Sequence, residues 1–474
     1  TAAGGWDAVT TNLPDNDWGN VQYHMVGSGP YYLSGYTIGT SYTLTANPAY
    51  TANPACTTTY IGGTNSCYPA AGSYAANVDV TWEVDPTPGE AAMASGVADL
   101  LGEFPTTQTA LLLQLIEQDK ATAISFPSIS VYFFPFDLDF SASAASAYPT
   151  GPITVPADFF SYIGMRNFFS TAFPYATSQS TIDTVGGIQY GFNYGGIIPQ
   201  GMGNYYPTNI SFPNSDPTSD VNDASSPAYW WAQMTTSGSP YYDPEAVACE
   251  TTTCQLPFFG ETGAPNYDQA LALEVQSVSE YSHGAIEIHT LDINFIQLVI
   301  NSLFSAPGEN PMPIFTLAWA PDYPDPTDYI GAMYYPNATY TYSNDYNEFT
   351  ENPATNSTSC SYNAIGTYSF PALQYWAAST TQIGQDCQGP AYNAMTFAEY
   401  QAAGDTNLAQ RALLYNMAEH IAQKLALYIY FFQSNELYVS APWVNQQSLN
   451  EQVTIGGGND QMYFWLNGNG MVPS

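Results

Sequence analysis

The residues with the clearest potential for binding chemistry lie at the end of one apolar segment, Ile314–Pro326, which reads IFTLAWAPDYPDP. Its first half is an apolar run that predicts a buried strand. Asp322 follows this strand, and the prolines after it argue against a helix and predict a rigid turn. A carboxylate held there beside Trp319 and Tyr323 can accept a hydrogen bond from a ligand, or it can cap a turn. The segment by itself favours the cap.

Seven further motifs follow one another along the chain and change that balance. They are Gly27–Tyr31 (GSGPY), Asn47–Tyr50 (NPAY), Ser95–Asp99 (SGVAD), Met165–Asn167 (MRN), Ile198–Gly201 (IPQG), Tyr242–Ala246 (YDPEA) and Arg411–Tyr415 (RALLY). In this order, together with the DYPDP segment, they resemble the family 5 solute-binding proteins of ABC transporters. That family includes oligopeptide- and dipeptide-binding proteins and their sugar- and nickel-binding relatives.

The resemblance implies a ligand site around Asp322. In peptide-binding members the aspartate of this motif receives the α-amino group of the ligand, and the strand before it pairs with the peptide as an extra strand. Asp322 is therefore expected to accept an amine or a hydroxyl, with backbone contacts from Ala318 and Ala320. Trp319 either stacks on the ligand or packs inward, and the inward position is favoured. The full expected ligand-binding set is Asp322, Trp319, Ala318, Ala320, Tyr323 and Phe432.

The resemblance also implies an α/β fold of the two-lobed periplasmic-binding-protein type (class II, peptide-binding), because family members close two lobes around a cleft. Mapped onto this chain, residues 1–120 form a β-rich segment of the first lobe, residues 121–445 form the second lobe, and residues 446–474 return to the first. Relatives carry a much longer stretch before the motif that begins here at Gly27. The N-terminal part of the first lobe is therefore expected to be absent from this chain, and a companion chain or a fragment of the same precursor is expected to complete it.

Hydrophobic periodicity predicts the elements that position this site. Strands are expected in Tyr31–Leu44, Val78–Val84, residues 125–140 and Ile286–Leu291, and helices near Pro88–Leu101 and in Asn266–Ser282, Asn294–Leu303 and residues 408–425. Residues 185–245 are rich in Gly, Pro and Asn and read mostly as loop. Residues 331–395 read as a long insertion.

The charge balance excludes one class of partner and restricts the ligand. The chain has 4 Lys+Arg against 41 Asp+Glu, a formal charge of -37 at pH 7. A nucleic-acid partner is excluded, because no basic patch can form. Carboxylates lose most of their charge near their reference pKa of about 4, so scarce bases suit an acidic extracellular milieu, although neutral drift of an acidic secreted protein gives the same composition. With only Lys120, Arg166, Arg411 and Lys424 available, and both arginines placed in structural motifs, no charged clamp for a ligand carboxylate is expected.

Six cysteines and three glycosylation acceptors fit an extracellular chain. The cysteines form three local pairs, namely Cys56 with Cys67, Cys249 with Cys254, and Cys360 with Cys387, and nearest-neighbour disulfides are expected among the 15 possible pairings. Asn209, Asn337 and Asn356 each begin an Asn-x-Ser/Thr triplet. No metal or cofactor is expected, since His283, Glu287 and His289 are read as one outward strand face rather than as ligands.

The function that these observations favour is capture of oligopeptides or oligosaccharides, outside the cell, for an ABC importer. An enzyme is not expected, because no GxSxG or HExxH element and no marked carboxylate pair occurs. The importer's permease is the implied partner, on an acidophilic, archaeal-like cell surface, with anchoring to the membrane through a segment not in this chain. The alternative is a structural cell-surface, filament or coat protein that reuses the binding-protein fold.

Overall fold

A computed structural model describes residues 31–444, apart from Gly39, 51–74, 83–86, 103–108, 186–187, 208–214, Pro324, Asn337, 352–359, 361–367 and Thr380. The described residues fall into two compact units. One contains residues up to Phe126 and again from Leu437, and the other is Pro127–Glu436. The expected return segment, 446–474, lies outside the described residues.

The first unit contains an antiparallel sheet and two short helices. The sheet is ordered β1 (Tyr31–Thr37), β2 (Ser41–Ala46) and β3 (Asn77–Thr81), and the other elements are α3 (Thr87–Ala94), β4 (Leu100–Gly102) and α4 (Thr109–Glu117). The predicted strand segment Tyr31–Leu44 is a hairpin, because a turn near Ile38 divides it. The helix predicted near Pro88–Leu101 stops at Ala94, since Gly96 adopts a positive φ of 75° that ends the helix and Leu100 then enters β4.

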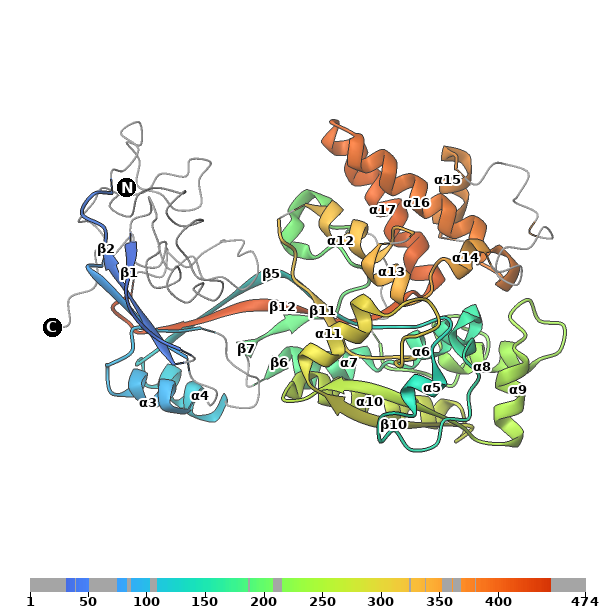
Figure 1. Cartoon of the computed structure of the whole chain (residues 1–474), viewed down its shortest axis with the longest axis horizontal. Helices are drawn as coiled ribbons and strands as arrows, with labels where there is room; N and C mark the ends of the chain where they lie inside the picture. The colour runs from blue at the N-terminus through green and yellow to red at the C-terminus, as the bar shows by residue number, and fades with distance from the viewer. Residues whose placement is uncertain are drawn as a thin grey trace, which may run out of the picture. The chain divides into compact units, whose positions relative to one another are not determined.

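The second unit contains most of the helices, and Figure 1 labels many of them. In chain order its elements are β5 (Thr122–Pro135, which begins in the first unit), α5 (Ala142–Ala145), η2 (Phe159–Ser161), α6 (Ile163–Ala172), α7 (Tyr175–Ser178), η3 (Gln179–Asp183), β6 (Thr184–Val185), β7 (Ile188–Gln189), β8 (Gly191–Phe192), η4 (Gln200–Tyr205), α8 (Pro227–Thr235), α9 (Pro244–Thr251), β9 (Cys254–Glu261), α10 (Pro265–Tyr281), β10 (Ile286–Ile293), α11 (Phe295–Phe304), β11 (Leu317–Trp319), α12 (Pro326–Met333), α13 (Thr339–Ser343), α14 (Glu348–Glu351), α15 (Phe370–Ala377), η6 (Gln385–Cys387), α16 (Gln388–Gly404), α17 (Leu408–Leu425) and β12 (Tyr428–Ser440, which ends in the first unit).

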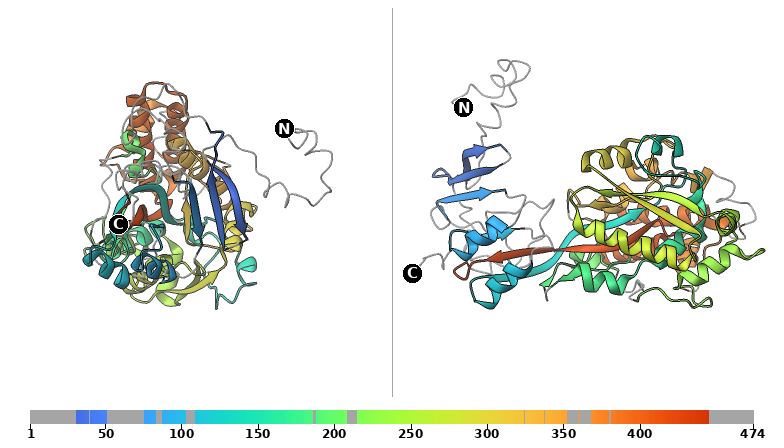
Figure 2. Two further views of the ribbon diagram at one scale, coloured as in Figure 1. Left: turned by 90° about the vertical axis from the view of Figure 1, so that its left-hand side faces the viewer. Right: turned by 90° about the horizontal axis from the view of Figure 1, so that it is seen from below.

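The predicted site strand, β11, is the end strand of a sheet ordered β11-β5-β12-β4, and β9 and β10 form a separate two-stranded sheet beside it. β10 and β9 are parallel, and β9 is bridged to the segment before β11 through Phe259 and Phe315. β11 pairs antiparallel with β5, and β12 follows β5 in the same sheet. The apolar run of β9 is buried on both faces, as expected for a central parallel strand covered by helices. α10 packs against β9 and β10, as the right-hand view of Figure 2 shows.

The core of this unit is built mainly from aromatic rings of neighbouring strands. Phe134 on β5 is stacked on Phe431 of β12, with ring centroids 4.5 Å apart, and meets Phe258 of β9 edge to face. All three side chains are almost fully buried. Aromatic pairs of this kind add to the free energy gained from burying apolar area. These contacts between the rings of β5, β9 and β12 therefore hold the strands around the site in place.

Two regions that were predicted as loop or insertion contain helices. Ser226 caps α8, its hydroxyl accepting from the N–H of Ala228, and Pro227 occupies the first helical position. The insertion of residues 331–395 contains α13 to α15 and the start of α16. Residues 185–245 are rich in Gly, Pro and Asn and residues 331–395 in Tyr, Asn and Thr, but the caps and the buried tryptophans of α8 and α15 determine the helices.

Candidate binding site around Asp322

The backbone of the site strand is oriented by its two neighbours. The N–H of Thr316 donates to the carbonyl oxygen of Phe259 (2.9 Å), on the β9 side. Main-chain groups alternate between the two edges of a strand, so those of Ala318 and Ala320 point to the same side as those of Thr316. Among the described strands, only β5 pairs with Leu317–Trp319, on the opposite side. The N–H and C=O of Ala318 therefore face a side where no described strand pairs with them.

The loop that follows β11 separates the two aspartates of the DYPDP motif into different roles. Asp325 caps α12, its Oδ1 accepting from the N–H of Thr327 (2.9 Å), and it forms a salt bridge with Arg411 at 2.6 Å. Burial raises the pKa of Asp325, but the hydrogen bonds from Arg411 and Thr327 outweigh burial and hold that pKa below its ordinary value. The turn-capping role considered for Asp322 is thus performed by Asp325, and Pro326 begins a helix rather than excluding one.

Asp322 itself presents its carboxylate to solvent. The residue is exposed, and its main-chain N–H donates to Oδ2 of Asp328 (2.7 Å), which fixes the loop. Within the described part of the chain, no residue donates a hydrogen bond to the Asp322 carboxylate. The arrangement places an exposed acceptor three residues after a strand that has no described strand partner on one edge.

The aromatic residues predicted for the site lie in three different environments. Tyr323 is 48% exposed, and its hydroxyl lies 3.4 Å from Oγ1 of Thr327. Trp319 is half-buried and meets Tyr340 edge to face, with centroids 5.5 Å apart, which is the inward of the two positions considered for it. Phe432 is 5% exposed and belongs to the core.

Tyr132 is a candidate that the sequence did not indicate. It is the register partner of Ala318 on β5, so the two side chains share one face of the sheet. Its ring also lies 5.2 Å from that of Phe432 and 5.5 Å from that of Tyr267, centroid to centroid. Only the strand register brings Tyr132 beside Ala318, and no local motif marks it.

All four Lys and Arg side chains are among the described residues, and none is near enough to Asp322 to form an ion pair with it. Arg166 is fully buried and donates to the carbonyl oxygens of Phe160 (2.6 Å) and Leu425 (3.1 Å from Nε), in keeping with its predicted structural role. Lys424 donates to the carbonyl oxygen of Trp376 (2.7 Å), and Lys120 is exposed in the first unit. The bond from Arg411 to Asp325 gives that arginine a structural role as well.

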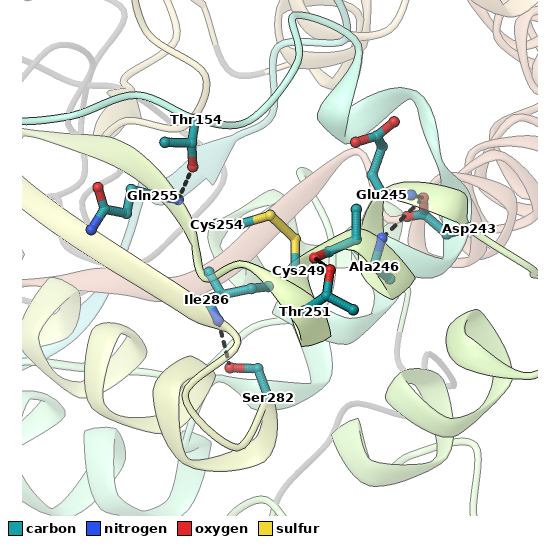
Figure 3. Close-up of a disulfide and its surroundings, with 11 residues drawn as sticks. Thr154, Asp243, Glu245, Ala246, Cys249, Thr251, Cys254, Gln255, Ser282 and Ile286 are labelled. Carbon is teal, nitrogen blue, oxygen red and sulfur yellow. Dashed lines mark hydrogen bonds between the residues drawn. A yellow bond between two sulfur atoms is a disulfide. The ribbon is translucent and has the colours of Figure 1, made fainter.

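Two of the three predicted disulfides are present. The bond between Cys249 and Cys254 links the last turn of α9, a helix that Asp243 caps at its other end, to the first residue of β9 (Figure 3). The bond between Cys360 and Cys387 closes the longer loop before α16, with the Cα atoms 5.2 Å apart.

The third predicted disulfide, between Cys56 and Cys67, is not among the bonds that the structure describes. Cys56 and Cys67 both fall within residues 51–74, which lie outside the described residues, so this pairing stays a prediction. The glycosylation acceptors Asn209, Asn337 and Asn356 lie outside the described residues too.

The histidine-containing trio does not form a single strand face. His283 has a positive φ of 55° in the turn before β10, whereas Glu287 and His289 lie on the strand. The strand begins only at Ile286, because the α10 C-terminus and Gly284 occupy the residues before it. No cluster of three or more metal-ligating side chains occurs among the described residues. None of the described helices combines the length and apolarity that a bilayer crossing needs.

Comparison with known proteins identifies the fold. No protein-family model and no curated protein matches the chain. The ABC transporter substrate-binding protein CtaP of Listeria monocytogenes matches with a TM-score of 0.59 at 11% identity, over 98% of this chain and 70% of that chain. DppA of Helicobacter pylori, solved with the peptide STSA, gives 0.54 at 12%, over 96% and 67%. OppA of Haemophilus influenzae, solved with RPPGFSPFR, gives 0.51 at 12%, over 96% and 68%.

These matches confirm the predicted fold class. The chain has the mixed α/β fold of the periplasmic peptide-binding proteins and spans between 61% and 70% of the length of such solved chains. The matched structures are substrate-binding proteins of transport systems and not enzymes. At identities of 11–12% the likeness extends to the fold alone.

Proposed function

We propose that this protein binds peptides by their amino end, as the extracellular substrate-binding component of an ABC importer. The observation that carries the proposal is the exposed carboxylate of Asp322 three residues after a strand whose Ala318 backbone groups lack a described partner. A bound peptide would extend the sheet beside β11, and its α-amino group would donate to Asp322. Charge-assisted hydrogen bonds of this kind are the stronger ones.

The remaining site residues would shape the pocket rather than anchor the ligand. Ala320 and Tyr323 are exposed next to Asp322 and would contact the first ligand residues. Trp319 would support the strand from within, and Phe432 would support Tyr132 from behind. With the three Lys and Arg side chains of the second unit already engaged, the carboxyl end of the ligand would meet no charged clamp from this unit. This favours peptides held along their backbone over very short peptides held at both ends.

The wider assignment follows from the same proposal. Residues 1–120 and 446–474 would belong to a first lobe and residues 121–445 to a second, with a companion chain completing the first lobe. The permease of the importer would be the partner, and the protein would act at an acidic cell surface, glycosylated and held to the membrane through a further segment. The small number of bases in the composition supports the acidic setting, since it limits net charge at low pH.

The test measures the affinity of the protein for a peptide and asks whether that affinity depends on the free α-amino group of the peptide. Protein from its natural source is first examined by native mass spectrometry, which identifies bound peptide, bound sugar or a companion chain. Calorimetry with the peptide found, and with its N-acetylated form, then compares wild type, Asp322→Asn and the exposed control Asp220→Asn. We expect Asp322→Asn to lose about 2 kcal/mol of binding free energy, roughly 30-fold in Kd.

The wild type and the control should bind the N-acetylated peptide more weakly than the free peptide, by about the same 2 kcal/mol. Asp322→Asn should bind both peptides equally, because the variant no longer recognises the charged amine. Equal affinity of Asp322→Asn and wild type for the free peptide would remove Asp322 from the site. A bound oligosaccharide would replace the peptide class with the sugar class. A lattice or fibre on electron micrographs of native material would favour the structural role instead.

A further inference from the structure

Two buried glutamates face each other across the α16–α17 hairpin. Glu399 on α16 and Glu419 on α17 are both 0% exposed, and the two helices pack side by side (orange to red in Figure 1). Oε2 of Glu419 accepts a hydrogen bond from the N–H of Ile197 (2.7 Å). No described residue donates a hydrogen bond to either oxygen of Glu399. Glu419 also accepts hydrogen bonds from the N–H of Ile198 and from the hydroxyl of Tyr334, which favour its charged form, whereas Glu399 has no such donor among the described residues.

The groups around this pair are phenols and not bases. The tyrosines whose rings interact electrostatically with the pair are Tyr194, Tyr334, Tyr335, Tyr392, Tyr415 and Tyr430. On α17 itself, Lys424 is held by carbonyl oxygens and His420 interacts with Lys424. Arg411 is committed to Asp325, and Arg166 to the carbonyl oxygens of Phe160 and Leu425. No base among the described residues is bonded to either carboxylate.

A buried carboxylate without a cation is costly, so such groups keep their protons. Burial raises the pKa of Glu419 to about 8. Burial raises the pKa of Glu399 well above its ordinary value, and the neighbouring Glu419 raises it further. Both side chains are therefore neutral in acid.

A second acid pair in the same unit has the same character. Oδ2 of Asp345 accepts from the N–H of Gly308 (3.0 Å), and Oδ1 of the fully buried Asp137 accepts from the N–H of Asp139 (3.1 Å). The titratable groups that interact with them are Asp139, Glu348 and Tyr346, with no base among them. Burial raises the pKa of Asp137 and of Asp345, the latter to about 6.

We propose that the second unit is a proton-dependent fold, in which the α16–α17 hairpin stays packed only while Glu399 and Glu419 are protonated. Each pH unit above the ordinary carboxyl range would weaken the fold, so an acidic medium would stabilise the structure itself. This inference does not depend on the ligand or on Asp322, and it goes beyond the proposed transport function. It would make the folded protein most stable in acidic compartments whatever it binds.

The direction of the effect follows from proton linkage. A carboxyl whose pKa is higher in the folded than in the unfolded chain binds more protons when folded, so its stabilisation is complete below the unfolded pKa of about 4.3. For Glu419 that stabilisation is lost progressively as the pH rises from there towards 8. Each such group raises the unfolding equilibrium constant by about tenfold per pH unit in this window.

The test measures unfolding and proton binding of the full chain. Denaturant unfolding followed at pH 4, 5, 6 and 7 should give an unfolding constant that rises at least about a hundredfold per unit between pH 5 and 7 for the wild type, about tenfold from each glutamate, with hydrogen exchange in α16 and α17 rising in parallel. Glu399→Gln and Glu419→Gln are isosteric and cannot ionise, so each should remove about tenfold per pH unit from that rise. The matched control Glu250→Gln changes an exposed residue of α9 and should keep the wild-type slope.

A flat pH dependence of the wild type, or Gln variants with the wild-type slope, would overturn the proposal. If a Gln variant does not fold at pH 4, potentiometric titration of the folded and unfolded wild type decides the question. The folded protein must then bind more protons than the unfolded chain at pH 6, and equal binding would refute the proposal. A loss of peptide binding in the Asp322 variant, with the pH dependence of unfolding unaltered, would concern the proposed ligand site and leave the proton-dependence proposal untouched.

Discussion

The buried guanidinium of Arg166 offers the most direct test of what holds the second unit together. Its donors reach the carbonyl oxygens of Phe160 and Leu425 and the side-chain oxygen of Gln388, and its charge lies over the ring of Phe349. Burial lowers the pKa of Arg166 to about 9, so the side chain remains charged at pH 5. Replacing it with methionine keeps the aliphatic stem but leaves three buried acceptors without a donor.

Each unmet buried acceptor costs about 1 kcal/mol at the low end, so Arg166→Met should lose roughly 3 kcal/mol of unfolding free energy at pH 5. Arg166→Lys keeps the charge but cannot reach all three acceptors, because the ammonium group lacks the planar fork, and it should lose an intermediate amount. The control Lys120→Met removes the same charge from an exposed position and should be nearly neutral. Urea unfolding followed by tryptophan fluorescence measures all three, and a loss below about 1 kcal/mol for Arg166→Met would refute this reasoning.

Two further predictions concern stability. Removing the disulfide between Cys360 and Cys387, which spans 27 positions, should cost about 3.6 kcal/mol by loop entropy, against about 2.2 kcal/mol for the one between Cys249 and Cys254, which spans 5. Double serine variants compared by denaturant unfolding test the order, and equal losses would contradict the loop-length account. Gly191→Ala should cost about 2 kcal/mol, because the new Cβ would collide with the main-chain carbonyl oxygen of Gln433 and with the ring of Phe432 on β12. Calorimetric melting measures that loss, and an unchanged Tm would show that β8 can move away freely.

The order of the motifs along the chain predicted the fold class, although the chain is only 11–12% identical to the solved structures that share the fold. Three of the motif residues make specific structural contacts. Asp325 of the DYPDP loop caps α12 and pairs with Arg411, and Arg166 donates to buried carbonyl oxygens. The apolar run before Asp322 was correctly read as a strand, although only Leu317–Trp319 are regular. The two described disulfides were also predictable, because short separations make nearest-neighbour closure the simplest pairing.

The remaining features depended on contacts between segments that are distant in the sequence. Nothing near Tyr132 in the chain reveals that it pairs with Ala318, because register is a property of two strands. The acid pair of Glu399 and Glu419 was equally invisible, since both residues have the sequence context of ordinary helix surfaces. The helices within residues 185–245 and 331–395 were missed because composition outweighed the short capping signals at Ser226 and Ser369.

The two aspartates of the DYPDP motif, Asp322 and Asp325, have different roles, and this difference has a consequence for the interpretation of related sequences. Asp325 belongs to the framework, because it both caps α12 and neutralises Arg411, whereas the Asp322 carboxylate contributes to no described side-chain bond. Selection for folding alone would therefore preserve the second aspartate and let the first drift. Homologues that bind ligands should retain both aspartates. Homologues that serve as structural surface proteins should retain the equivalent of Asp325 and lose that of Asp322. One column of an alignment would then separate transporters from coat proteins that share this architecture.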